Sequence, residues 1–143
     1  MAVTPKLFGN AILKAFNKEI DIDGDTIKVM LATDAVAPVQ STWDYKNDVT
    51  NEITGTGYTA GGATISSPSI VLNTNVVKID GADVSWTSAT FTCRYAYIYD
   101  ATPGTDATRP LIAYIDFGEN ISVNAGTFQI TFAADGIVTI TVA

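Results

Sequence analysis

The sequence predicts an all-β fold, an antiparallel β-sandwich or flattened barrel with one short N-terminal helix, in a single domain over residues 1–143. Three observations predict the sandwich, which we expect over 26–143. Two apolar runs in 83–117 flank a polar loop rich in turn residues, a pattern typical of a β-hairpin with a long loop. Apolar and polar residues alternate over 128–132, as in a half-buried strand. The Asp-Gly pair at 135–136 is a strong hairpin-turn signal.

The helix is predicted over residues 4–18. Thr4 is a good N-cap and Pro5 suits the first helical position. Apolar residues recur at every fourth position and define one face, which consists of Phe8, Ile12 and Phe16. This face is expected to dock either on the protein's own sandwich or on a neighbouring subunit.

The acidic stretch 21–25 (DIDGD) predicts a turn between the helix and the first strand, with Gly24 in a left-handed conformation. Its spaced carboxylates also raise the question of calcium. An EF-hand loop needs glycine at its sixth position and glutamate at its twelfth, where this chain has Thr26 and Ala32. A weak metal site stays as the alternative to a plain turn, and no metal site is predicted.

A strand is predicted over 26–32, followed by a long polar loop over 33–51. A loop of this length is uncommon in a compact domain unless it binds something or is tied down. Trp43 and Tyr45 offer two interpretations. They could anchor the loop in a pocket, or they could form a contact surface with another subunit, because aromatic residues are enriched at interface cores.

The glycine-rich stretch 52–65 predicts tight turns. A phosphate-binding P-loop would need Lys-Ser or Lys-Thr after its glycines and a helix behind it, and neither is present. Short strands are predicted over 69–73 and 76–79, with a turn at 73–75. Trp86 is expected to anchor the core, because its side chain buries a large apolar area.

The central hairpin has a predicted register in which Tyr99 lies opposite Leu111, and Arg94 opposite Asp116 as an ion pair. One face of the hairpin then carries Tyr95, Tyr97, Tyr99, Leu111, Ala113 and Ile115. The other face carries Arg94, Ala96, Ile98, Ile112, Tyr114 and Asp116. Both faces are largely apolar, so we expect a central hairpin that is covered on both sides.

Beyond this hairpin, turns are predicted at 118–120 and 125–126, with a short strand at 121–123 between them. The segment 137–142 (IVTITV) is expected to add a last, Thr-rich strand.

Composition argues against several classes of partner. The formal net charge is −7, and the eight Lys and Arg residues are scattered, whereas a nucleic-acid-binding surface needs them clustered. No apolar run approaches the roughly 20 residues of a membrane span, and no signal peptide is expected. Charged residues make up only 16% of the chain and hydrophobic residues 47%, which favours buried subunit contacts, with a β-rich core as the alternative explanation.

The inventory of reactive side chains is small. The chain has no histidine, so the usual Ser-His-Asp arrangement and the usual general base are absent. Cys93 is the only cysteine and is expected to be a buried hydrophobe in a protein made in a reducing cytoplasm. Acids such as Asp100, Asp116 and Glu119 lie at hairpin ends, where solvated carboxylates are normal. We therefore expect no enzyme activity, no catalytic residues and no cofactor.

Three pieces of sequence carry a resemblance that extends over nearly the whole chain: 57–62 (GYTAGG), Trp86 with 89–91 (ATF), and 110–118 (PLIAYIDFG). With these pieces the chain resembles a family of small virion structural proteins of tailed bacteriophages. The resemblance implies a β-rich accessory protein of the particle without enzyme activity.

The acidic charge, the small size and the lack of a fibre-like repeat favour the capsid exterior as its location. The leading hypothesis is a capsid decoration or cement protein that binds the major capsid protein and itself, as a homotrimer or a dimer, after assembly in the host cytoplasm. The helix and the loop 33–51 are the expected contacts, with Phe8, Ile12, Phe16, Trp43 and Tyr45 as interface residues. The alternatives are a tail, neck or fibre-base component, and a host-glycan-binding β-sandwich that uses Trp43 and Tyr45.

Overall fold

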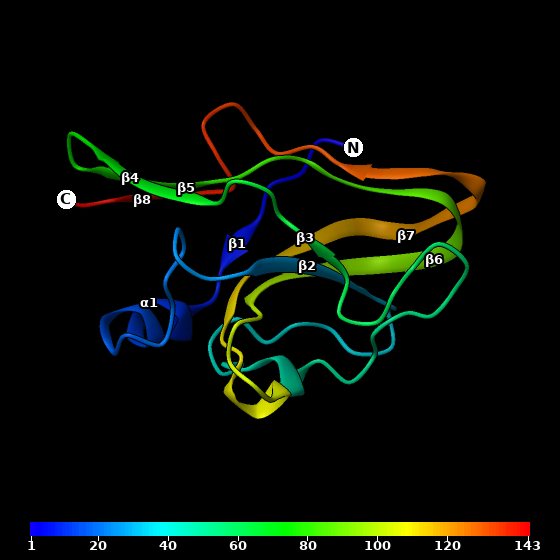
Figure 1. Cartoon of the computed structure of the whole chain (residues 1–143), viewed down its shortest axis with the longest axis horizontal. Helices are drawn as coiled ribbons and strands as arrows, with labels where there is room; N and C mark the ends of the chain where they lie inside the picture. Colours follow the sequence, from blue (N-terminus) through cyan, green and yellow to red (C-terminus); the bar gives the residue numbers. More distant parts are fainter.

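The computed structural model describes residues 1–143 as two antiparallel sheets and one short helix (Figure 1). The five-stranded sheet has the order β1-β7-β6-β2-β3, and the three-stranded sheet has the order β4-β5-β8. The elements are β1 (Lys6–Leu7), α1 (Gly9–Phe16), β2 (Ile27–Ala32), β3 (Ala63–Thr64), β4 (Ser69–Asn73), β5 (Val76–Asp80), β6 (Val84–Asp100), β7 (Leu111–Ile130) and β8 (Val138–Thr141), with short 3-10 turns at Lys46–Asp48 and Asp106–Thr108. The predicted all-β fold is confirmed, and of the two predicted forms the barrel is wrong, because the sheets do not close on each other.

The β6–β7 hairpin dominates the fold, and its strands are longer than predicted. The turns expected at 118–120 and 125–126 are wrong, because β7 runs through both positions as a bent strand. Gly118 and Ala125 take φ values of 82° and 49°, and the register shifts opposite them. These are β-bulges, which bend a strand and increase its twist without ending it.

The predicted hairpin register holds at the loop end and is wrong by one residue beyond it. Tyr99 lies opposite Leu111 as expected, but a shift between Ile98 and Tyr99 places Tyr97 opposite Tyr114. A shift of one residue moves side chains to the other face of the sheet. The tyrosines 95, 97 and 99 therefore share their face with Tyr114, whereas Ala113 and Ile115 join the opposite face.

The Arg94–Asp116 contact survives this shift. Asp116 lies directly opposite Tyr95, one residue along from the predicted partner. The Arg94 Nε atom still donates a hydrogen bond of 2.8 Å to Asp116 Oδ1. The predicted ion pair is therefore confirmed as a diagonal contact.

Both faces of the hairpin are covered, as predicted, by two separate clusters of buried side chains. The larger cluster joins the two sheets and includes Trp86, Ile98, Ile112, Ile79 and Val138. Trp86 is buried there among aromatic rings and so anchors the core as expected. The smaller cluster lies under α1 and consists of Phe8, Ala11, Met30, Ala32, Tyr95, Tyr97, Tyr99, Leu111 and Tyr114.

The predicted helix boundary is wrong at its beginning. Residues 6–7 form β1, which pairs with Ala113 and Tyr114 at the edge of β7, and α1 begins only at Gly9. The Phe8 N–H continues this pairing with a hydrogen bond of 3.0 Å to Ile112 O. Tertiary pairing thus overrides the capping signal of Thr4 and Pro5, because an unpaired sheet edge offers backbone partners that an isolated helix turn does not.

The acidic stretch 21–25 forms a turn, as predicted, but Gly24 is not left-handed. Its N–H donates to Asp21 Oδ1 at 3.1 Å, and a Cβ atom at Gly24 would lie 2.3 Å from Asp21 Oδ2. Glycine is therefore needed for space beside the carboxylate, not for its φ angle. No group of three or more His, Cys, Asp or Glu side chains is placed to hold a metal ion, and no helix is long and apolar enough to cross a membrane.

Candidate protein-contact surface

The three interface residues predicted on the helix, Phe8, Ile12 and Phe16, differ in how far they are exposed. Phe8 is 0% exposed and stacks near Tyr97 and Tyr114 in the smaller cluster, so its prediction as an interface residue is wrong. It precedes the first turn of the helix, and β1 directs it into the core. Ile12 is 36% exposed and Phe16 is 85% exposed, so only the second half of the predicted stripe is available for a partner.

Trp43 packs onto the protein's own core. Its ring centroid lies 6.5 Å from that of Phe8 and 5.8 Å from that of Tyr97, and its side chain is half-buried. Of the two interpretations of this residue, anchoring the loop is therefore the one that its contacts support. The ring therefore packs inward and remains only partly exposed.

Tyr45 is tied to the helix by polar contacts. Its hydroxyl donates to Glu19 Oε2 at 2.6 Å and accepts from Lys14 Nζ at 2.5 Å. The hydrogen bond with Tyr45 raises the pKa of Lys14 above its ordinary value, with further support from the Glu19 carboxylate. These contacts fix the loop 33–51 against α1, which explains how so long a loop stays ordered in a compact domain.

Among the exposed apolar residues that sequence reasoning missed, three lie on β4. Leu72 is 71% exposed, Val71 51% and Ile70 40%, and all three stand in succession on one strand. Leu13 and Val142 are exposed as well. The sequence signal for this exposed strand was the uncharged run SIVLN at 69–73. We predicted a strand from it, but not that the strand would be exposed.

An apolar groove joins these two regions at one end of the molecule, where α1 and the three-stranded sheet lie near each other (Figure 1). The groove has a volume of about 280 Å³, and Asp21 is its one polar lining residue. Helix and sheet both contribute to its walls, which include Ile12, Ala15, Ile20, Ile70, Ile79 and Ile140. We call the groove together with the exposed side chains of Ile12, Leu13, Phe16, Ile70, Val71 and Leu72 the apolar end.

The alternation along the small sheet explains why its groove face is apolar. Side chains two residues apart share a face, and directly paired residues of neighbouring strands share it too. The registers of β4, β5 and β8 therefore place one set of aliphatic residues on one face: Ile70, Leu72, Val77, Ile79, Val138 and Ile140. Ile79 and Val138 are buried in the larger core cluster, while the face becomes progressively exposed toward Leu72.

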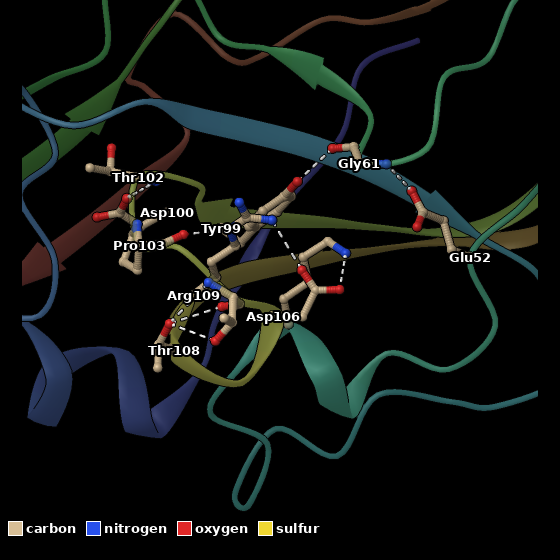
Figure 2. Close-up of polar contacts among 11 residues, drawn as sticks. Glu52, Gly61, Tyr99, Asp100, Thr102, Pro103, Asp106, Thr108 and Arg109 are labelled. Atoms are coloured by element: carbon tan, nitrogen blue, oxygen red, sulfur yellow. Dashed lines mark hydrogen bonds and ion pairs between the residues drawn. The ribbon is translucent and has the colours of Figure 1, made fainter.

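A second, polar hollow lies beside the β6–β7 loop. It has a volume of about 740 Å³ and is lined by charged and hydroxyl side chains that include Lys28, Lys46, Glu52, Asp106 and Arg109. Figure 2 shows three of them, Glu52, Asp106 and Arg109. The Lys46 ammonium lies 2.9 Å from Asp106 Oδ2, and the Arg109 guanidinium contacts Asp106 Oδ1 at 3.1 Å. The hydrogen bond from Lys46 holds the pKa of Asp106 below its usual value.

Glu52 and Tyr99, which also line the hollow, are engaged in internal contacts. Glu52 Oε1 accepts from the Gly61 N–H at 2.6 Å and from the Tyr58 hydroxyl at 2.8 Å, and the Tyr99 hydroxyl donates to Gly61 O at 2.7 Å (Figure 2). Burial raises the pKa of Tyr99 to about 12. These hydrogen bonds hold the glycine-rich turn against β2 and β6. Their role is therefore to fix the conformation of this turn.

Asp100, at the end of β6, is the one fully buried carboxyl group. Its Oδ1 accepts from the Thr102 N–H at 3.0 Å, and its Oδ2 has no donor in reach (Figure 2). Burial, together with the neighbouring Asp25 carboxyl, raises the pKa of Asp100 to about 6. The two acids can form a hydrogen bond with each other only when one of them holds a proton.

Comparison with known proteins finds no matching family model, no matching curated protein and no matching solved structure. The resemblance to phage structural proteins therefore stays a prediction from the sequence.

Proposed function

We propose that this protein is a structural protein of a tailed-bacteriophage virion, most simply a capsid decoration or cement protein that binds the assembled major capsid lattice from outside. The observation that carries the protein-contact part is the apolar end, where α1 and β4 carry exposed apolar side chains and both contribute to the lining of one groove. Contiguous exposed apolar surface marks interaction sites, and interface cores are depleted in charge.

The lattice part of the proposal follows from the sequence resemblance and from linkage. A ligand that binds only the assembled shell stabilises that shell by mass action. An accessory protein of this kind, assembled onto the particle in the host cytoplasm, needs apolar anchors and no catalytic group. Its partners in this proposal are the major capsid protein and further copies of itself, as a trimer or a dimer, with neither nucleic acid nor membrane involved.

The test adds purified variants to particles that lack the protein, and measures occupancy and heat resistance. Phe16→Asp and Leu13→Asp should lower occupancy strongly, because each places a charge in the apolar end at an exposed position that the fold does not need. The matched control is Ser85→Asp, which adds the same charge at an exposed position of β6 outside this surface.

Full binding by both helix variants would remove the apolar end as the capsid contact. Copy number separates the capsid from the alternative location, because decoration needs hundreds of copies per particle and a tail or neck ring needs only a few. A handful of copies at the tail would replace the capsid proposal with that alternative.

A further inference from the structure

We infer that β4 pairs with β4 of a second copy of this chain, antiparallel about a twofold axis that passes beside Val71, so that two three-stranded sheets become one six-stranded sheet. The inference rests on the self-association included in the proposed function, and it is independent of the capsid.

The backbone of β4 is free on one side. β4 is the outer strand of its sheet, and its only ladder is with β5. No other backbone or side-chain hydrogen bond involves residues 69–73. One edge of a five-residue strand therefore presents unpaired N–H and C=O groups, which are a template for another strand.

This edge lacks the features that keep edge strands apart. Natural proteins protect such edges with lysine, proline, bulges or inward-pointing charges. β4 has none of these within 69–73, and instead carries the exposed side chains of Ile70, Val71 and Leu72. An edge that is both unpaired and apolar is a predicted site for pairing with another strand.

Symmetry decides the direction of the pairing. A twofold axis parallel to the strand would pair the two copies of β4 in parallel. It would also exchange the two faces of the second sheet, so that the apolar face of one copy would lie beside the polar face of the other. A twofold axis perpendicular to the sheet pairs β4 antiparallel and keeps the groove face with Ile70 and Leu72 continuous across the dimer. The antiparallel arrangement is therefore the one that buries apolar surface.

The alternation of side chains decides the register. Paired residues must share a face, which excludes every register displaced by one residue. The symmetric register centred on Val71 uses all five residues and pairs Ile70 with Leu72 of the second copy, Val71 with its own counterpart, and Ser69 with Asn73. Each apolar residue then meets an apolar residue, and each polar one a polar one.

Charge favours a second copy as the occupant in spite of the chain's net charge of −7. β4 is uncharged, and the nearest charges on β5 neutralise each other, since Lys78 Nζ lies 2.9 Å from Asp80 Oδ2. The pairing surface therefore brings no like charges together. The twofold arrangement also uses the β4 edge of both copies, so the assembly closes at a dimer.

The first experiment measures the mass of the free full-length protein by sedimentation at several concentrations. The wild-type protein should be a dimer. Val71→Lys should weaken the dimer by more than about tenfold, because it places two ammonium groups directly opposite each other. The matched control Thr139→Lys adds the same charge at an exposed position of β8, in the same small sheet, and should leave the dimer intact.

A monomeric or trimeric wild-type protein, an unchanged Val71→Lys dimer, or equal loss in the two lysine variants would each overturn the inference. A monomer that still binds particles would overturn the dimer but leave the proposed function intact. A dimer that fails to bind particles would support the pairing of β4 but contradict the proposed function.

The second experiment tests the register without disturbing the fold. Val71→Cys should form a disulfide-linked dimer on mild oxidation, because directly opposite residues of an antiparallel pair have the Cα separation that a disulfide needs. The buried native thiol does not compete, since burial raises the pKa of Cys93 to about 12. Thr139→Cys should stay unlinked, and equal linking of the two variants would overturn the register.

Discussion

The two sheets of this protein share an antiparallel architecture but differ in how they are covered. The β6–β7 hairpin at the centre of the large sheet has buried side chains on both faces, and Tyr97 and Ile98, adjacent on β6, are both essentially inaccessible. The small sheet has one apolar face that is buried at Ile79 and open at Leu72. The difference shows that the hydrophobicity of a strand does not tell whether its side chains are buried. What decides this is whether other segments of the chain pack on both faces of the strand.

The coverage of the large sheet comes from segments distant in sequence. The smaller core cluster receives Phe8 from the segment before α1 and the half-buried Trp43 from the loop 33–51. The small sheet receives no comparable cover over β4. Its exposed strand edge and the groove beside it are therefore where a partner can add apolar contacts without rearranging the fold.

The largest effect that tests this comparison is expected from the same substitution at two phenylalanines. Phe8→Ala should lower the free energy of unfolding by about 3–5 kcal/mol, because it opens a cavity in a fully packed cluster. Phe16→Ala, at the exposed end of α1, should change it by no more than about 0.5 kcal/mol. Chemical denaturation of the two variants measures both values.

Similar losses in the two variants would contradict the assignment of Phe8 to the core and Phe16 to a contact surface. All samples in these measurements must have the same protein concentration, because the stability of the dimer proposed above depends on protomer concentration.

The alternation of the central hairpin was readable from the sequence, because the odd-numbered tyrosines from 95 to 99 differ from the small aliphatic residues between them. The bulges were not readable. A register shift between Ile98 and Tyr99 depends on the whole ladder, and no local composition marks it. Gly118 did mark an irregular position, but a bulge and a turn use the same residue types.

The exposure of the predicted interface residues could be read only in part from the sequence, for a similar reason. Periodicity identified the helix face, but it could not show that β1 would direct Phe8 inward or that Trp43 would stack on the core. Aromatic residues occur both in cores and at interfaces, so their presence does not separate the two. The uncharged run in β4 marked a strand, but the sequence could not show that its outer edge stays unpaired in the fold.

A medium effect is expected from the buried acid that ends β6 in the covered sheet. The folded pKa of Asp100 is about 6, above its ordinary value of 3.8, so folding favours the protonated form. The contribution of Asp100 to stability is fully present below pH 3.8 and is lost as the pH rises to about 6. Asp100→Asn stays neutral and keeps the oxygen that accepts from the Thr102 N–H.

The variant should therefore be more stable than the wild type at pH 8 by roughly 2–3 kcal/mol, since one pKa unit corresponds to about 1.4 kcal/mol, and the difference should vanish near pH 4. Thermal or chemical unfolding across this pH range measures it. The control is Asp80→Asn at the end of β5, which loses an ion pair with Lys78 and gains no such stability. A pH-independent difference for Asp100→Asn would contradict the proposed burial of a titrating acid.

The smallest effect is expected at the exposed edge of the central hairpin, where Arg94 and Asp116 meet across the strands. The hydrogen bond from Arg94 lowers the pKa of Asp116, so this pair contributes above the unfolded pKa of the acid and is lost as the pH falls below it. Asp116 Oδ1 also accepts from the Gly118 N–H at 2.8 Å.

Asp116→Ala should therefore destabilise more than Arg94→Ala, because it also removes a bond that holds the β7 bulge. The double variant should lose less than the sum of the two, and 1 M salt should reduce this coupling by screening the pair. Strictly additive losses would mean that the ion pair is incidental and that the bulge alone fixes Asp116.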